Sequence, residues 1–197
     1  MEQKQVKELL LQSLEHERGG IKVYQTAIKC AVNEDLKEEW EKYLEQTEHH
    51  VEVLQDVFSQ MQLDPEEQTP GRKIVHDLGL ALVSAMEAAL GAGDPAAAQI
   101  VAGECVVIAE TKDHMDWELI GEVSKKLTGA DGKALKEAYN EVEDQEDEHL
   151  YHSRGWTREL WIEALGMKAV LPPPEERKHV KTAIGAARAE QERKSMK

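Results

Sequence analysis

The sequence predicts an all-α protein: a four-helix bundle with a long helical crossover between bundle helices 2 and 3 and an extra C-terminal helix. Long helix-permissive segments are separated by a few breaks rich in glycine and proline, and no segment shows the alternation of a half-buried strand. Four segments run to roughly 28–37 residues, or about 40–55 Å each at the rise of an α-helix. Four long helices with one long connection are typical of a bundle with a crossover, because simple up-and-down hairpins need only short loops.

The first two bundle helices are expected over residues 3–31 and 34–62. Asn33 carries a side chain that can cap the second helix, and Asp35 follows in the first turn, where a negative charge is favourable. The stretch LDPEEQTPG (63–71) contains two prolines and therefore ends this helix.

The crossover is expected over residues 63–94, with a shorter helix at 71–91 inside it. The break GAGDP then leads into the third bundle helix, expected over 95–127. The break LTGADG separates it from the fourth bundle helix, expected over 131–167.

The chain is expected to form one domain over residues 1–167, followed by a proline-rich linker at 168–174 and a basic C-terminal helix or tail at 175–197. A helix is predicted over 175–194, and residues 175–197 carry seven Lys or Arg against four Glu. Such a segment can dock on the acidic bundle of its own subunit or of a partner subunit. We therefore expect a homodimer or a higher homo-oligomer.

The net charge of −15 argues against nucleic acid as the main partner and suits a protein that attracts cations. No apolar run approaches the ~18–20 residues that span a bilayer, so no membrane partner is expected. The first residues, MEQKQVKELL, lack the apolar core of a signal peptide, which favours a cytoplasmic location. Cys30 and Cys105 lie far apart in apolar contexts and are expected to be reduced core residues.

A glutamate interrupts the apolar stripe of the first helix. Apolar residues recur there at helical spacing: Leu10, Leu14, Ile21, Tyr24 and Ile28. Glu17 occupies the position that is missing from this series. Burying an unpaired carboxylate costs several kcal/mol, so Glu17 either reaches water at the edge of the stripe or pairs with a cation.

The fourth bundle helix has the same feature in the stretch EDQEDEHLYH (143–152), where Glu146 and His149 continue the inward stripe three residues apart. In the second helix, Thr47 and His50 point to the middle of the stripe, so His50 is the best inward ligand. Glu48 lies at the edge of that stripe, and His49 points outward.

The third bundle helix is apolar on more than one side. We favour Glu110 as its inward acid, with His114 and Asp113 as possible additions. Glu104 is the competitor if the helix is rotated differently. All four long helices thus place a carboxylate or an imidazole in an inward position at mid-length. Carboxylates can bridge two cations and imidazoles can supply terminal nitrogens, which predicts a dinuclear site for Fe or Mn.

The chain resembles the ferritin-like superfamily of rubrerythrins and bacterioferritins over about residues 5–165. The resemblance lies in Glu17 followed seven residues later by Tyr24, and in the Glu-x-x-His pair of Glu146 and His149. The stretch 33–65 looks most like the second helix of the YciE/YciF-type bacterial stress proteins. This likeness implies reduction of O₂ or peroxide with oxidation of Fe(II), a di-metal oxidoreductase in which Tyr24 is close enough to donate an electron or a hydrogen bond.

One departure from the family pattern leaves two functions open. Di-iron members usually carry Glu-x-x-His on the second helix as well, whereas Thr47 and His50 stand here. Either Glu48 or Asp113 replaces the missing carboxylate, or one metal binds, or the site has decayed. The first hypothesis is a metal-binding protein with ferroxidase, peroxidase or oxidase-type chemistry. The alternative is a stress-related structural or interaction module on the same fold, whose polar core is satisfied by internal hydrogen bonds and water.

Overall fold

The computed structural model describes residues 2–196, and within this part of the chain every regular element is helical. The all-α class is therefore confirmed. The helices follow in the order α1 Gln3–Cys30, α2 Glu34–Gln60, α3 Pro70–Gly91, α4 Pro95–Ser124, α5 Gly129–Ala164, α6 Pro174–Arg177, α7 Ala183–Glu192 and the 3₁₀ turn η1 Arg193–Ser195.

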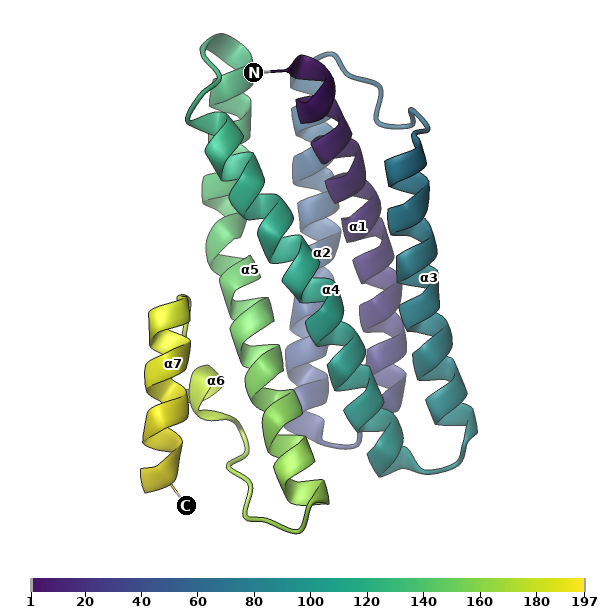
Figure 1. The fold of residues 1–197 in the computed structure, drawn as a ribbon, viewed down its shortest axis with the longest axis vertical. Coiled ribbons are helices and arrows are strands. Elements are labelled where there is room, and N and C mark those ends of the chain that lie inside the picture. Colours follow the sequence, from purple (N-terminus) through teal and green to yellow (C-terminus); the bar gives the residue numbers. More distant parts are fainter. Residues whose placement is uncertain (1, 197) are drawn as a thin grey trace.

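Helices α1, α2, α4 and α5 lie side by side as a four-helix bundle (Figure 1). Helix α1 contacts α2 and α4, and α5 contacts α4 and α2. The chain returns along the outside of the bundle through α3, so α2 and α4 run in the same direction (Figure 1). The helical crossover therefore connects two parallel bundle helices.

Side-chain caps explain where three of the helices begin. Asn33 accepts a hydrogen bond from the Leu36 amide at the start of α2, as the sequence predicts. Thr69 and Asp94 do the same for α3 and α4, and each is followed by a proline in the first helical position. The start of each of these three helices is thus encoded locally by a polar cap.

Helix α3 packs on the outside, against α1 and α4. Two glycines allow the close approach to α1, because a Cβ built on Gly79 would lie 3.6 Å from the Cα of Gly19. Much of its apolar surface is exposed, including Ile74 and Leu78. Helix α3 is also long and apolar enough to cross a membrane by length and composition. The expectation that no segment approaches this limit was wrong for α3, since the residues after Asp77 are nearly uncharged.

The buried apolar residues form two clusters. One holds the C-terminal half of α1 and the N-terminal half of α2, with Tyr24, Tyr43 and Trp156 among its large members. The other holds the opposite halves of the same helices, with Leu14 and Trp117 among its members. The stretches between the clusters lie at mid-length in all four bundle helices, and these stretches carry buried polar residues that include Glu17, His50, Glu110 and Glu146.

The C-terminal segment, residues 165–196, folds back on its own bundle. Lys181 Nζ lies 3.0 Å from Asp144 of α5, and Arg158 of α5 lies 2.7 Å from Glu175. The single helix predicted over 175–194 is divided into α6 and α7, because His179 adopts a positive φ of 48°. The basic segment thus docks on the acidic bundle within one subunit.

Candidate metal centre

Five of the predicted ligands meet at mid-length in the bundle core. Helices α1, α2 and α4 supply Glu17, His50 and Glu110, and α5 supplies Glu146 and His149. Each of these five residues is at most 3 % exposed. In all four helices, the structure therefore has the predicted rotation, in which these side chains point into the bundle core.

Two Glu/His triads share one carboxylate. The first triad is formed by Glu17, His50 and Glu146, and the second by Glu110, Glu146 and His149. Within each triad, the three possible ligand atoms all lie within 4.8 Å of one another. His50 Nδ1 lies 2.9 Å from Glu146 Oε1, and His149 Nδ1 lies 3.8 Å from the same oxygen. A carboxylate placed between two such groups can bridge two cations.

The atoms that face one another in this cluster are left without hydrogen bonds from the protein. His50 Nδ1 is close to Glu146, but the pair does not have hydrogen-bond geometry. In and beside the cluster, the unpartnered buried side-chain atoms are Glu17 Oε2, His50 Nδ1, Glu110 Oε2, Asp113 Oδ1, both oxygens of Glu146 and His149 Nδ1. Orphaned buried polar atoms are rare, so several that converge on one point indicate a site for cations.

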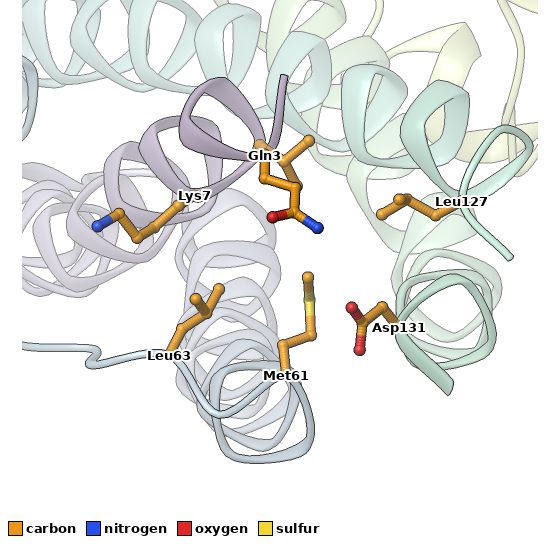
Figure 2. A pocket seen from close by; sticks show the side chains of 7 residues that line it. Gln3, Lys7, Met61, Leu63, Leu127 and Asp131 are labelled. Carbon is orange, nitrogen blue, oxygen red and sulfur yellow. The ribbon is translucent and has the colours of Figure 1, made fainter. Parts of the chain in front are cut away.

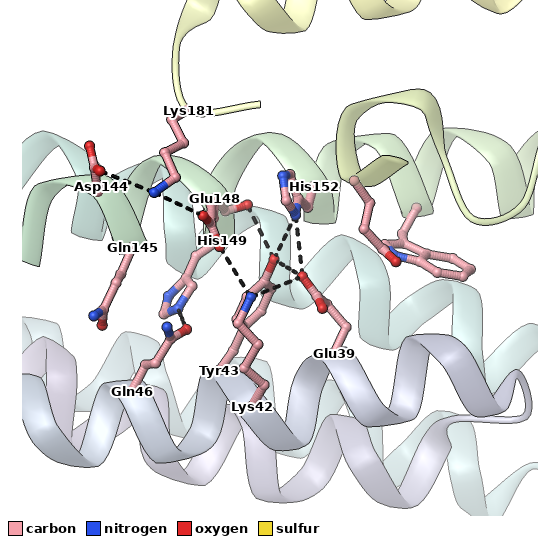
Figure 3. Close-up of polar contacts among 12 residues, drawn as sticks. Glu39, Lys42, Tyr43, Gln46, Asp144, Gln145, Glu148, His149, His152 and Lys181 are labelled. Carbon is pink, nitrogen blue, oxygen red and sulfur yellow. Dashed lines mark hydrogen bonds and ion pairs between the residues drawn. The ribbon is translucent and has the colours of Figure 1, made fainter. Parts of the chain in front are cut away.

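Two glutamines fix the orientation of the histidines. His50 Nε2 donates to Gln145 Oε1 and His149 Nε2 donates to Gln46 Oε1, both at 2.9 Å. The second of these contacts is visible in Figure 3. Because Nε2 donates to a glutamine, Nδ1 is the nitrogen that each imidazole turns toward the carboxylates, and it can bind a cation once any proton on it is displaced. The two rings are therefore already arranged as metal ligands.

Two aromatic residues hold the terminal carboxylates. Tyr24 donates to Glu110 Oε1 at 2.7 Å, and Trp117 Nε1 donates to Glu17 Oε1 at 2.8 Å. Each contact leaves the other oxygen of the glutamate buried without a hydrogen-bond partner. Tyr24 thus makes the hydrogen bond expected of it, to a predicted ligand.

These supporting contacts reveal a correspondence between the two halves of the bundle that the sequence analysis missed. Glu17 and Tyr24 in α1 are seven residues apart, as are Glu110 and Trp117 in α4. A Gln four residues before the ligand His recurs in the same way: Gln46 and His50 in α2, Gln145 and His149 in α5. The repeated spacings were the available signal for Trp117 and for both glutamines.

The same correspondence shows where α2 departs from the Glu-x-x-His pattern, which is at Thr47. Thr47 is the counterpart of Glu146, three residues before the ligand His, and its hydroxyl donates to the Tyr43 carbonyl. Gly20 is the counterpart of Asp113, and a Cβ on Gly20 would lie 3.2 Å from the Thr47 side chain. One half of the centre therefore has two small residues where the other has two acids.

Asp113 is buried beside the cluster but belongs to neither triad. Burial raises the pKa of its carboxyl well above the ordinary value, and the charges of Glu146 and Glu17 raise it further. Burial likewise raises the pKa of Glu146. Burial alone would lower the pKa of His50, but Glu17 and Glu146 raise it well above its usual range. The metal-free cluster thus holds protons that a cation would displace.

The remaining candidates lie outside the cluster. His49 is half exposed and contacts Glu141 at 2.8 Å, and Glu48 is exposed. Glu104 is exposed and accepts a hydrogen bond from Trp161. His114, predicted as an additional ligand, contacts Asp147 at 2.8 Å on the outer side of α4. The structure therefore does not bring His114 into either triad.

Glu39, Tyr43 and His152 form a second set of polar contacts next to His149 (Figure 3). The Tyr43 ring is tilted over the His149 ring at 4.1 Å, and the Tyr43 hydroxyl lies 3.0 Å from His152 Nδ1. Glu39 accepts a hydrogen bond from the same hydroxyl. Burial and Glu39 raise the pKa of Tyr43 well above its ordinary value. These contacts fix the ring that supports His149.

One cavity of the described chain lies far from the centre. It has a volume of about 150 Å³ at the end of the bundle where α1 begins, and Figure 2 shows Gln3, Met61 and Leu127 around it. It contains Lys7 and Asp131 but none of the triad residues. We assign no chemistry to it.

Comparisons with protein-family models, with curated proteins and with solved structures find no match for this chain. The class that the fold and the site define is a helical protein with buried Glu/His clusters that could hold a metal ion.

Proposed function

We propose that this chain is a ferritin-like protein that binds two Fe or Mn ions in the bundle core and uses them to reduce O₂ or peroxide. The observation that carries the proposal is the position of Glu146, which two Glu/His triads share. A single carboxylate common to two ligand groups is suited to bridging two cations. The parallel bundle helices joined by a helical crossover support the ferritin-like assignment.

The charge of the ligands supports two divalent ions. Glu17, Glu110 and Glu146 supply three carboxylates. The family pattern has a glutamate at the position of Thr47, and Asp113 would supply the fourth carboxylate instead. Four carboxylates balance two divalent cations, and the two imidazoles add neutral nitrogen ligands. This mixture of oxygen and nitrogen suits Fe or Mn, whereas structural zinc sites favour thiolates and fewer ligands.

Each residue has a defined role in the proposed centre. Glu146 would bridge, Glu17 and Glu110 would be terminal carboxylates, and His50 and His149 would be terminal nitrogen ligands. The bound metal ions would supply the electrons that reduce O₂ or peroxide, and their oxidation balances the reaction. Tyr24 keeps Glu110 in place through its hydroxyl, within the same buried core.

The alternative is a structural or interaction module whose polar core is satisfied by internal hydrogen bonds and water. Such a core requires that each buried polar group pair with another protein group or with an ordered water. The atoms of Glu17, Glu146 and both histidines that lack a protein partner lie together among buried carboxylates, and such a set of groups suits a cation better than water. The metal-binding function is therefore the one that the geometry favours.

Anaerobic titration of the metal-free protein with Fe(II) tests the proposal. We expect an end point of about two Fe(II) per chain, from one ion at each triad, and a Glu146→Gln variant that loses both. Glu163→Gln is the matched control, because Glu163 is an exposed glutamate of the same helix, α5, and is no part of either triad. Absence of tight Fe(II) and Mn(II) binding by the unmodified protein would refute the proposal. Oxidation of the bound Fe(II) on addition of O₂ or peroxide tests the reaction separately.

A further inference from the structure

A cavity of about 230 Å³ adjoins the metal centre between α4, α5 and the start of α7. Its wall includes Glu146, the shared carboxylate of the two triads, and Trp117, which holds Glu17. The outer part is lined by polar and charged side chains: His114, Glu118, Glu143 and Asp147. Thr182 and Ala183 of the C-terminal segment complete the wall. The cavity thus extends from an acidic mouth to Glu146, whose carboxylate oxygens lie buried directly behind its wall.

We propose that this cavity is the access route by which divalent cations reach the metal centre, with His114 and Asp147 as a first, transient binding position. This inference rests on the proposed metal-binding function. It gives a role to His114, whose Nε2 lies 2.8 Å from Asp147 Oδ1 and whose Nδ1 lies 3.9 Å from Glu118. An imidazole beside two carboxylates is a suitable weak site for a cation in transit.

The inner end of the cavity provides an independent indication of a ligand. Glu146 is 1 % exposed, and neither of its carboxylate oxygens has a hydrogen-bond partner. An acidic mouth on the surface attracts cations from solution. A buried, unpartnered carboxylate at the inner wall then provides a tighter position beyond it.

The other hollows are less suited to cations. A hollow of about 180 Å³ between α1, α3 and α4 is lined mainly by apolar residues and by Lys112, whose charge repels cations. An acidic groove between α2 and α5 contains Glu52 and Glu141 but no residue of either triad. That groove is useful as a control, since it has similar charge without contact with the centre.

The inference is tested by the rate of metal loading. Metal-free protein is mixed with Co(II), and the visible absorption of bound Co(II) is followed in a stopped-flow instrument at low and high salt. We expect the Glu118→Gln, Asp147→Asn variant to load about tenfold more slowly at low salt, because a local field that attracts the cation is lost. Its final Co(II) content should equal that of the unmodified protein.

The matched control is Glu52→Gln, Glu141→Gln, which removes the same charge from the groove between α2 and α5. Slower loading in the first variant and not in the control supports the inference. Equal rates in all proteins, or equal slowing in both variants, would overturn it while leaving the metal-binding function intact. A lower final Co(II) content in the first variant would also overturn it, because Glu118 or Asp147 would then be a ligand of the centre. No Co(II) binding by the unmodified protein would remove both proposals.

Discussion

At the scale of the residue, the two glutamines orient the ligand histidines without contributing a ligand themselves. Replacing Gln46 by Leu removes the acceptor of the His149 Nε2 proton. We expect metal affinity to fall by about 10–100-fold, the usual effect of losing such a supporting contact. Gln46→Glu keeps an acceptor and should retain most of the affinity. A competition titration with a chelator measures both variants, and equal losses in the two would show that Gln46 acts only through packing.

Asp113 is expected to compensate for Thr47. Asp113→Asn should weaken the binding of one of the two metal ions, because only three carboxylates then remain to balance four positive charges. Thr47→Glu combined with Asp113→Asn restores the number of carboxylates to four and should recover the binding of the second ion. Metal content after dialysis against a weak chelator distinguishes these cases. If Asp113→Asn binds two ions as tightly as the unmodified protein, Asp113 has no part in the centre.

Most of the candidate ligands could be predicted from the sequence, since Glu17, His50, Glu146 and His149 stand within an apolar stripe at helical spacing. Glu110 was favoured over Glu104 on a helix that is apolar on more than one side, and the structure brings Glu110 together with the other four. The residues that support them were not found in this way, because Gln46 and Gln145 lie at the edges of their stripes. His114 was included because a small difference in helix rotation decides whether a side chain points inward or outward.

At the scale of the element, the short turn between α4 and α5 depends on the absence of a side chain at Gly132. A Cβ there would lie 2.2 Å from the Leu127 carbonyl oxygen. We expect Gly132→Ala to lower the free energy of unfolding by about 1–3 kcal/mol, since the backbone has to shift. Gly91→Ala is the control, because nothing lies within 4 Å of a Cβ at that position. Urea denaturation measures both, and equal stability of the two variants would contradict the expectation.

The helix boundaries were predicted to within a few residues because caps and breaks are local signals. Asn33 and the prolines of the crossover determined them. The C-terminal segment was less predictable, since its path depends on contacts that are distant in the sequence. Glu159 of α5, for example, pairs with Arg193 and accepts a hydrogen bond from the Val170 amide.

At the scale of the whole molecule, the stability of the metal-free protein should fall as pH rises from 7 to 8. The pKa of His50 is raised well above its usual range by Glu17 and Glu146, against the effect of burial. The folded state therefore keeps a proton that the unfolded chain releases, and this stabilisation is lost as pH rises through the folded pKa. Each such proton changes the free energy of unfolding by about 1.4 kcal/mol per pH unit.

The pH interval avoids groups with the opposite sign. Burial lowers the pKa of His16, so its opposite effect on stability is complete below pH 7. The raised pKa values of Cys30 and Cys105 have the same sign as that of His50, but they act at higher pH. Thermal unfolding at pH 7 and pH 8, with and without Mn(II), measures the effect. We expect the metal-loaded protein to be more stable at pH 8 than the metal-free protein by a larger margin than at pH 7, because metal binding releases protons. The same margin at both values would contradict the protonation proposed for the core.

The dinuclear centre is the central claim, and a crystal structure of the Mn(II)- or Fe(II)-loaded protein tests it most directly. Anomalous diffraction measured on both sides of the metal absorption edge locates the ions without reference to the surrounding side chains. We predict two anomalous peaks in the bundle core, about 3.5–4 Å apart as in other two-metal sites, one beside Glu17 and His50 and the other beside Glu110 and His149, with Glu146 contacting both. A core without anomalous density in crystals of fully loaded protein would contradict the claim.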